Sequence, residues 1–152
     1  MRAHRHAQQR AARATYLLPR SDTSARWARH LTTAYFDHGC GEQISADRLD
    51  DAKLVVSELV TNATRHGRGS CLLRLSVRNG QVMVEVHDNS PAGPRLRAVE
   101  QAQTVDRAQP ADQADVTSES GRGIALVRAL SCRLSVQPGP GAGKTVQAVL
   151  AA

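Results

Sequence analysis

Two stretches in the first half of the chain repeat apolar residues at the spacing of a helix. The first runs from residue 25 to residue 35 and is followed by Gly39. The second starts after Ser45, which has the side chain of a helix N-cap, and stops at Gly67. We expect its inward side to consist of Leu49, Ala52, Val56, Leu59 and Ala63. Apolar residues also occupy most of its other faces, which predicts that this helix is buried nearly all round.

A period of two residues follows and predicts a β-hairpin. Residues 71–78 alternate apolar and polar side chains, Asn79 and Gly80 have the composition of a type I′ turn, and residues 81–88 alternate again. Asp88 has the parity of the valines before it, so its carboxylate should reach the core side where the strand ends. A buried carboxylate is costly unless it is hydrogen-bonded. Asp88 should therefore either cap nearby backbone or bind a ligand.

The remaining elements are shorter. They are three strands and one helix, expected at residues 15–18, 133–137, 145–150 and 124–130. A glycine-containing loop, residues 120–123, should precede that helix. Residues 90–119 have no clear period, and an irregular stretch of this length inside a compact domain is typical of a functional lid or of disorder.

Composition and charge fit one domain with a basic N-terminal arm. The chain of 152 residues is long enough for a real core, and we place a single domain at residues 15–152. The net charge is +6, and residues 1–14 contain arginines but no acid, which predicts a solvated arm. A nucleic-acid-binding arm is less favoured, because no aromatic or groove-reading motif accompanies the arginines.

Cysteine usage and hydropathy favour a cytoplasmic location. The 3 cysteines are widely spaced and form no C-x-x-C pair, so reduced thiols are expected rather than zinc ligands or a disulfide framework. There is no apolar run long enough for a membrane span and no export signal. We expect no membrane partner.

Four polar residues follow one stripe of the second helix. Glu58 and Asn62 are four residues apart and share a face, and Arg65 and His66 continue the stripe. A carboxylate and a carboxamide that point the same way from a buried helix suggest a ligand, and our first hypothesis is a metal-bound anion. The alternative is a satisfied pair in the core.

Two glycine-containing segments can approach an anion closely. Gly121 and Gly123 open a helix, whose N-terminus favours negative charge, although this pattern alone is a weak signal. Residues 138–145 nearly match a P-loop, but Pro138 stands at the first glycine position and only one strand follows, where a P-loop needs a helix. We interpret this second segment as a hairpin loop.

The order of these features resembles the GHKL (Bergerat) family of ATP-binding domains, shared by histidine kinases, gyrase-type ATPases and Hsp90. Within it, the chain is most similar to the small anti-sigma-factor serine kinases of the RsbW and SpoIIAB type. Residues 57–63, which read SELVTNA, resemble the N box of that subfamily, and residues 120–127, which read SGRGIALV, resemble its second glycine box. The resemblance covers roughly residues 15–150.

The resemblance implies an α/β (α+β) two-layer sandwich, with a mixed, mostly antiparallel sheet and helices on one face. Asn62 would bind the Mg²⁺ that bridges the ATP phosphates, and Glu58 would be the general base. Asp88 would accept a hydrogen bond from the adenine amino group, with Thr145 beside it. The residues implied to line the phosphates or the rim of the pocket are Arg65, His66, Ser120, Gly121, Arg122, Gly123 and Ile124.

Two positions depart from the family pattern. The first glycine box of the family usually reads D-x-G-x-G, whereas this chain has Asp88-Asn89-Ser90-Pro91-Ala92-Gly93. Glu119 stands where the sporulation-type kinases carry an arginine that meets the γ-phosphate. Because phosphoryl transfer depends on positioning and charge neutralisation, these departures should weaken transfer before they weaken binding.

The leading hypothesis is a regulatory ATP- and Mg²⁺-binding protein, an anti-sigma-factor serine/threonine kinase. Its partners would be a sigma factor and an antagonist (anti-anti-sigma) protein, and a homodimer is allowed. The exposed side of the first helix, with Arg26, Arg29 and His30, is the candidate partner surface. The alternative is a nucleotide-dependent protein-binding module without kinase activity, and a basic nucleic-acid-binding protein is a third and poorer option.

Overall fold

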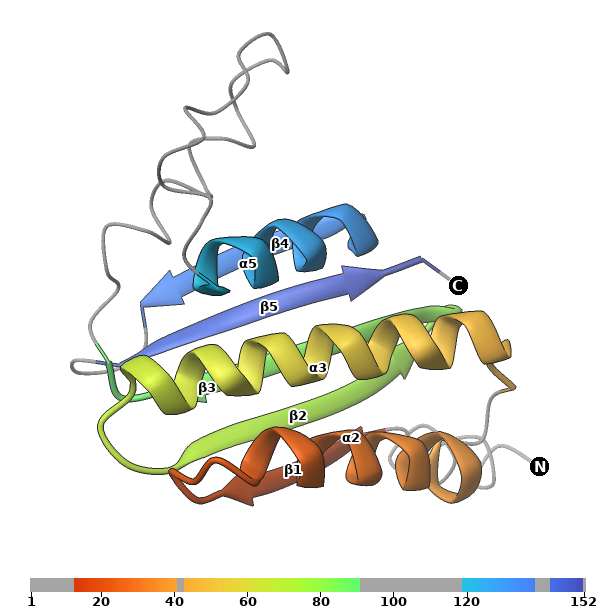
Figure 1. Ribbon diagram of the computed structural model, residues 1–152. Coiled ribbons are helices and arrows are strands. Elements are labelled where there is room, and N and C mark those ends of the chain that lie inside the picture. Colours follow the sequence, from red (N-terminus) through yellow and green to blue (C-terminus); the bar gives the residue numbers. More distant parts are fainter. Residues whose placement is uncertain (1–12, 41–42, 91–118, 139–142, 152) are drawn as a thin grey trace, which may run out of the picture.

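Antiparallel strands form one sheet, and helices cover one of its faces (Figure 1). The computed structural model describes residues 13–40, 43–90, 119–138 and 143–151. Within these residues the strands are β1 (Arg13–Leu18), β2 (Cys71–Arg78), β3 (Gln81–Asp88), β4 (Arg133–Pro138) and β5 (Lys144–Leu150). Their order across the sheet is β1-β2-β3-β5-β4, and each neighbouring pair is antiparallel. The expected two-layer α/β sandwich is confirmed.

The hairpin of β2 and β3 has the predicted turn and the predicted parity. Asn79 and Gly80 have φ angles of 53° and 74°, the left-handed conformation that a type I′ turn requires. The buried apolar side chains of the two strands are Cys71, Leu73, Leu75, Val77, Val82, Val84 and Val86. Asp88 shares this parity and is buried with them.

The helical layer is built around one long central helix. Its members are α2 (Ser24–Ala34), the π-helical turn η1 (Tyr35–Gly39), α3 (Ala46–His66) and α5 (Glu119–Leu130). In Figure 1, α3 lies between α2 and α5 across the middle of the sheet.

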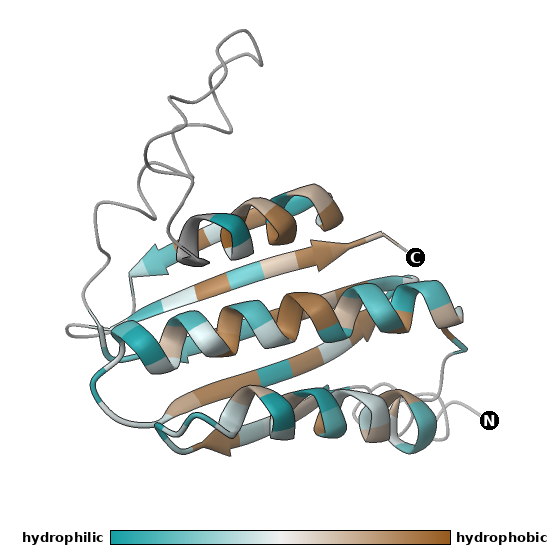
Figure 2. Ribbon diagram, viewed as in Figure 1, coloured by the Kyte–Doolittle hydropathy of each residue, from teal (hydrophilic) through white to brown (hydrophobic). Residues whose placement is uncertain are grey.

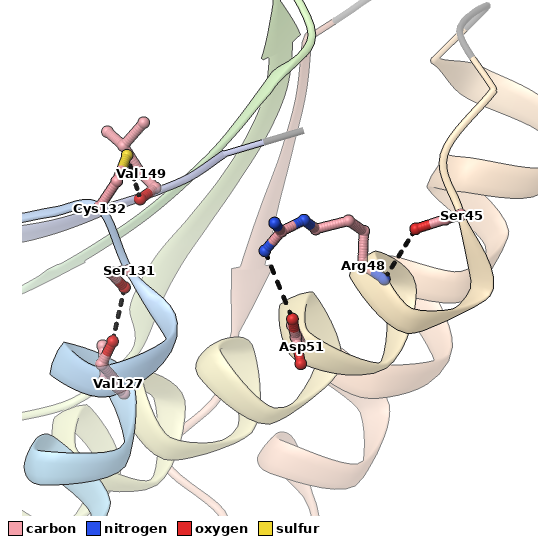
Figure 3. Close-up of polar contacts among 7 residues, drawn as sticks. All are labelled: Ser45, Arg48, Asp51, Val127, Ser131, Cys132 and Val149. Carbon is pink, nitrogen blue, oxygen red and sulfur yellow. Dashed lines mark hydrogen bonds and ion pairs between the residues drawn. The ribbon is translucent and has the colours of Figure 1, made fainter.

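Side-chain hydrogen bonds mark the ends of two helices (Figure 3). Ser45 caps α3 as expected, because its hydroxyl oxygen accepts a hydrogen bond from the backbone N of Arg48 at 3.2 Å. After α5, the hydroxyl of Ser131 donates to the carbonyl oxygen of Val127 at 2.6 Å. These bonds satisfy backbone groups that have no partner within a helix.

The prediction that α3 is buried nearly all round is wrong. Its side toward the sheet is buried through Ala52, Val55, Val56, Leu59, Val60 and Ala63. Leu49 is only partly buried, however, and Leu54 is 44% exposed. Figure 2 shows hydrophilic and hydrophobic residues intermixed along the visible side of this helix. The neighbouring helices cover the flanks of α3 and leave its outermost side in solvent.

Two segment boundaries differ from the sequence-based expectation. Arg13 and Ala14 were assigned to the basic arm, but they begin β1, because they pair with Ser76 and Leu75 of β2. The sequence predicts a loop at residues 120–123, but these residues lie within the first two turns of α5. The rest of the arm (residues 1–12) and residues 91–118 of the expected lid lie outside the described residues.

The face of the sheet without helices carries polar side chains that bond across strands. Arg74 Nη1 lies 3.5 Å from Glu85 Oε2, and Gln147 Nε2 donates to Glu85 Oε1 at 2.9 Å. This polar row indicates a solvent-facing surface. Of the helices in the described ranges, none has the length and apolar character needed to cross a membrane.

Candidate functional site

Asp88 ends β3 with its carboxylate on the helical side of the sheet, where it is 3% exposed. Its Oδ1 accepts hydrogen bonds from the backbone N of Ser90, at 2.7 Å, and from the Ser90 hydroxyl. Local capping, one of the two expected roles, is therefore present, and it occupies one carboxylate oxygen. The other oxygen, Oδ2, faces the ammonium of Lys144 at 3.9 Å.

Two glycines lie next to Asp88, and each is in a tight backbone contact. A Cβ at Gly67, the residue after α3, would lie 2.3 Å from the carbonyl oxygen of Ala63 and 3.5 Å from the Cβ of Asp88. A Cβ at Gly143, just before β5, would lie 2.8 Å from the Asp88 carbonyl oxygen. Glycine at 143 thus lets the start of β5 approach the end of β3, and glycine at 67 lets the chain pass close to the last turn of α3, at the end of the molecule where Figure 1 shows these segments together.

Lys144 is the second charged side chain at this end of the sheet. It lies opposite Asp88 in the pairing of β3 with β5, and it is 3% exposed. Burial lowers the pKa of Lys144, and the Asp88 carboxylate opposes that shift. Burial, followed by the effect of the same carboxylate, raises the pKa of the Cys71 thiol to about 11. A buried Asp–Lys pair therefore forms one wall of the candidate site.

Glu58 of α3 lies directly against α5. A Cβ at Gly123 would lie 2.1 Å from Oε2 of Glu58 and 3.0 Å from its Cδ. With the Glu58 carboxylate in this position, any side chain at residue 123 would force the carboxylate to move. The contact joins the two segments that carry the family resemblance, which are far apart in the sequence.

Asn62 follows Glu58 by one turn of α3 and is also partly buried. Its amide oxygen suits Mg²⁺, which takes few protein ligands and keeps phosphate oxygens and water. Within the described ranges, no group of three or more His, Cys, Asp or Glu side chains is arranged to hold a metal. A Mg²⁺ ion at Asn62 would take phosphate oxygens and water as its other ligands. Arg65 and His66, in the last turn of α3, are exposed, in keeping with a place at the rim.

The first turns of α5 contribute mainly backbone. Ser120 and Gly121 lie in the first turn, whose N–H groups have no partner within the helix and favour an anion. Arg122 is exposed, and Ile124 packs partly buried against the core. This end of α5 therefore offers backbone donors, with one arginine at the surface.

Thr145 does not share a face of the sheet with Asp88. Thr145 pairs with His87, and its hydroxyl lies 3.0 Å from His87 Nδ1 on the face of the sheet without helices. Successive side chains of a strand point to opposite faces. Lys144, rather than Thr145, therefore shares a face with Asp88.

Lys144 and Ser90 contact Asp88, and the sequence interpretation predicted neither contact. The signal for Lys144 was the alternation of β5, because Val146 and Leu150 are core residues of the same parity. The signal for Ser90 was its spacing, since an aspartate commonly bonds the backbone two residues later in the chain.

The candidate site thus combines a buried carboxylate at a strand end, a Glu–Asn stripe on the central helix and a glycine-containing helix start. The chain belongs to the histidine kinase-like ATPase domain family, which it matches over residues 18–150. All the candidate residues lie inside this match. The family gives the chain an ATP-binding function, with Mg²⁺ as the usual companion ion. No curated protein matches the chain.

Proposed function

We propose that this chain is an anti-sigma-factor protein kinase that transfers the γ-phosphate of Mg-ATP to a serine hydroxyl of an antagonist (anti-anti-sigma) protein. The observation that carries the proposal is the contact between Glu58 and Gly123. It puts a carboxylate beside the first turns of α5, where phosphates are expected to bind. A general base has to lie within hydrogen-bonding reach of the hydroxyl that it deprotonates.

In the proposed reaction each side chain has one task. Asp88 accepts a hydrogen bond from the adenine amino group through Oδ2, and Asn62 helps to hold Mg²⁺, which neutralises phosphate charge. Glu58 takes the proton of the serine hydroxyl while the serine oxygen bonds to the γ-phosphorus. The bond from that phosphorus to the β–γ bridging oxygen breaks, and ADP leaves. The N–H groups of the first turn of α5 and the exposed Arg122 stabilise the transferred group.

The proposed surface for the sigma factor or the antagonist is the outer side of α2. Trp27 is 62% exposed, and its ring centroid lies 6.4 Å from that of His30 in an edge-to-face arrangement. Exposed Arg26 adds positive charge beside them. Arg29 has a different role, because it donates to Ser57 Oγ of α3 at 2.9 Å and so ties α2 to the helix that carries Glu58. A homodimer through this surface and a cytoplasmic location are compatible with the proposal.

The test separates nucleotide binding from phosphoryl transfer. Glu58→Gln removes the base and keeps the size of the side chain. Phosphoserine formation on the antagonist, measured with γ-labelled ATP, should fall about a hundredfold or more, while calorimetric affinity for Mg-ATP stays unchanged. Glu85→Gln makes the same chemical change on the other face of the sheet and should leave both quantities unaltered. Undiminished transfer by Glu58→Gln would show that Glu58 is not the base.

A nucleotide-dependent protein-binding module without kinase activity is the second candidate function. Ser90 favours it, because its two hydrogen bonds to Asp88 fix backbone at a position where the family has flexible glycines. Glu119 also favours it, because the sporulation-type kinases carry an arginine at this position that meets the γ-phosphate. If this candidate is correct, the wild-type protein binds Mg-ATP and captures its antagonist only with ATP, and no phosphoserine forms.

A further inference from the structure

Lys144 has no task in the proposed transfer, yet its side chain is 3% exposed. Lysine is rarely buried in this way unless its charge is paired. The pairing here is loose, at 3.9 Å from Asp88 Oδ2, and burial has a larger effect on the pKa of Lys144 than the carboxylate has. An apolar side chain would complete the core side of β5 without this desolvation cost. The buried ammonium is therefore a candidate for a specific task.

Asp88 and Lys144 place a hydrogen-bond acceptor and a donor side by side. Oδ1 of Asp88 is satisfied by Ser90, which holds the carboxylate so that Oδ2 faces the ammonium. The 3.9 Å between Oδ2 and Nζ is longer than a hydrogen bond. Each atom can therefore bond to one of two adjacent positions on a ligand, and an ammonium offers only donors.

We propose that Lys144 reads the nucleotide base together with Asp88, by donating a hydrogen bond to N1 of adenine. The inference rests on the proposed ATP binding, in which Asp88 accepts from the adjacent amino group. Adenine presents an amino donor next to an unprotonated ring nitrogen, which matches the acceptor and the donor of this pair. Guanine presents a carbonyl next to an N–H, the reverse order. In the same pose, its carbonyl would face Asp88 and its N–H would face Lys144, so the pair selects adenine.

Calorimetric titrations of the full chain with Mg-ATP, Mg-GTP and Mg-1-deaza-ATP test this assignment. In 1-deaza-ATP a C–H replaces N1. Wild type should bind ATP about tenfold or more tightly than 1-deaza-ATP, because one charge-assisted hydrogen bond is lost, and GTP should bind more weakly than ATP. Lys144→Met, which keeps the length of the side chain without its donors, should bind ATP and 1-deaza-ATP equally. Lys53→Met, at a lysine on α3, is the matched control and should keep the wild-type ratio.

The outcomes separate this inference from the function on which it rests. If wild type binds ATP and 1-deaza-ATP equally, if Lys144→Met keeps the preference, or if GTP binds as tightly as ATP, the base-reading role is overturned and ATP binding stands. If wild type binds no ATP, both are overturned. If circular dichroism shows that Lys144→Met does not fold, two other measurements test the base-reading role. One is the affinity of wild type for ATP relative to 1-deaza-ATP, and the other is the same ratio for Lys144→Gln, which keeps a donor and should keep part of the preference for ATP.

Discussion

Gly123→Ala is expected to stabilise the protein only when the Glu58 side chain is absent. Alanine is more favourable than glycine inside a helix by about 0.8–1 kcal/mol, and Gly123 lies within α5. In the wild-type protein, however, the new Cβ would lie 2.1 Å from Glu58 Oε2. Because non-bonded heavy atoms settle at roughly 3.5 Å, the carboxylate would have to move by roughly 1.4 Å.

This displacement opposes the gain in helix propensity. Moving Glu58 away from its preferred rotamer costs about 0.5–1.5 kcal/mol, so Gly123→Ala in wild type should change the free energy of unfolding by roughly zero. The three atoms nearest to the new Cβ all belong to Glu58. In a Glu58→Ala background the clash is therefore gone, and the same substitution should stabilise by about 1 kcal/mol. The expected coupling free energy between the two positions is about 1 kcal/mol.

The assay is urea denaturation of wild type, both single variants and the double variant, without nucleotide. Far-UV circular dichroism is the suitable probe, because the only tryptophan, Trp27, is 62% exposed and reports weakly on packing. The urea midpoints of the four proteins should differ, while the slope of the free energy of unfolding against urea concentration stays the same. An equal effect of Gly123→Ala in both backgrounds would refute the contact between Glu58 and α5, and with it the place given to the proposed base.

Two further predictions concern Cys71 and Gly143. The pKa of Cys71 rises from 9.0 to about 11 on folding, so between these values the native state binds more protons than the unfolded state. The stability from this thiol is full below pH 9 and is lost toward pH 11, by about 3 kcal/mol in total. Cys71→Ala should reduce this loss of stability between pH 9 and pH 11, measured by urea denaturation at several pH values under reducing conditions. An unchanged dependence of the free energy of unfolding on pH would contradict the raised pKa of Cys71. Gly143→Ala should destabilise by about 1–3 kcal/mol, because the Asp88 backbone cannot move aside. Gly39→Ala, whose Cβ would meet only the Tyr35 side chain, at 3.4 Å, should cost less, and equal losses would argue against the close approach at Gly143.

The elements of the fold were predictable because their signals are local. Ser45 caps α3, Asn79 and Gly80 form the turn, and alternation along β3 carries Asp88 to the core side. Each of these features depends on residues within one or two turns of chain, where steric and hydrogen-bonding preferences act directly.

The arrangement of the site was less predictable because it depends on packing between distant segments. No local pattern shows that Gly123 receives the Glu58 carboxylate, or that α3 keeps one side in solvent. The position of Thr145 is a different case, since the alternation of β5 already assigned Lys144 to the core side. The resemblance implies that the Thr145 hydroxyl lies beside Asp88, whereas the alternation of β5 places this hydroxyl on the opposite face of the sheet.

Titration with Mg-ATP tests the central claim, that Asp88 holds the nucleotide, most directly. Asp88→Asn alone would leave the buried ammonium of Lys144 without its counter-charge, so its effect would combine binding with stability. The informative comparison is between Lys144→Met and the double variant Asp88→Asn/Lys144→Met. We predict that wild type binds Mg-ATP and that the double variant binds it about tenfold or more weakly than Lys144→Met does, through the loss of one hydrogen bond to a charged acceptor. No binding by wild type, or equal affinities of these two variants, would contradict the account.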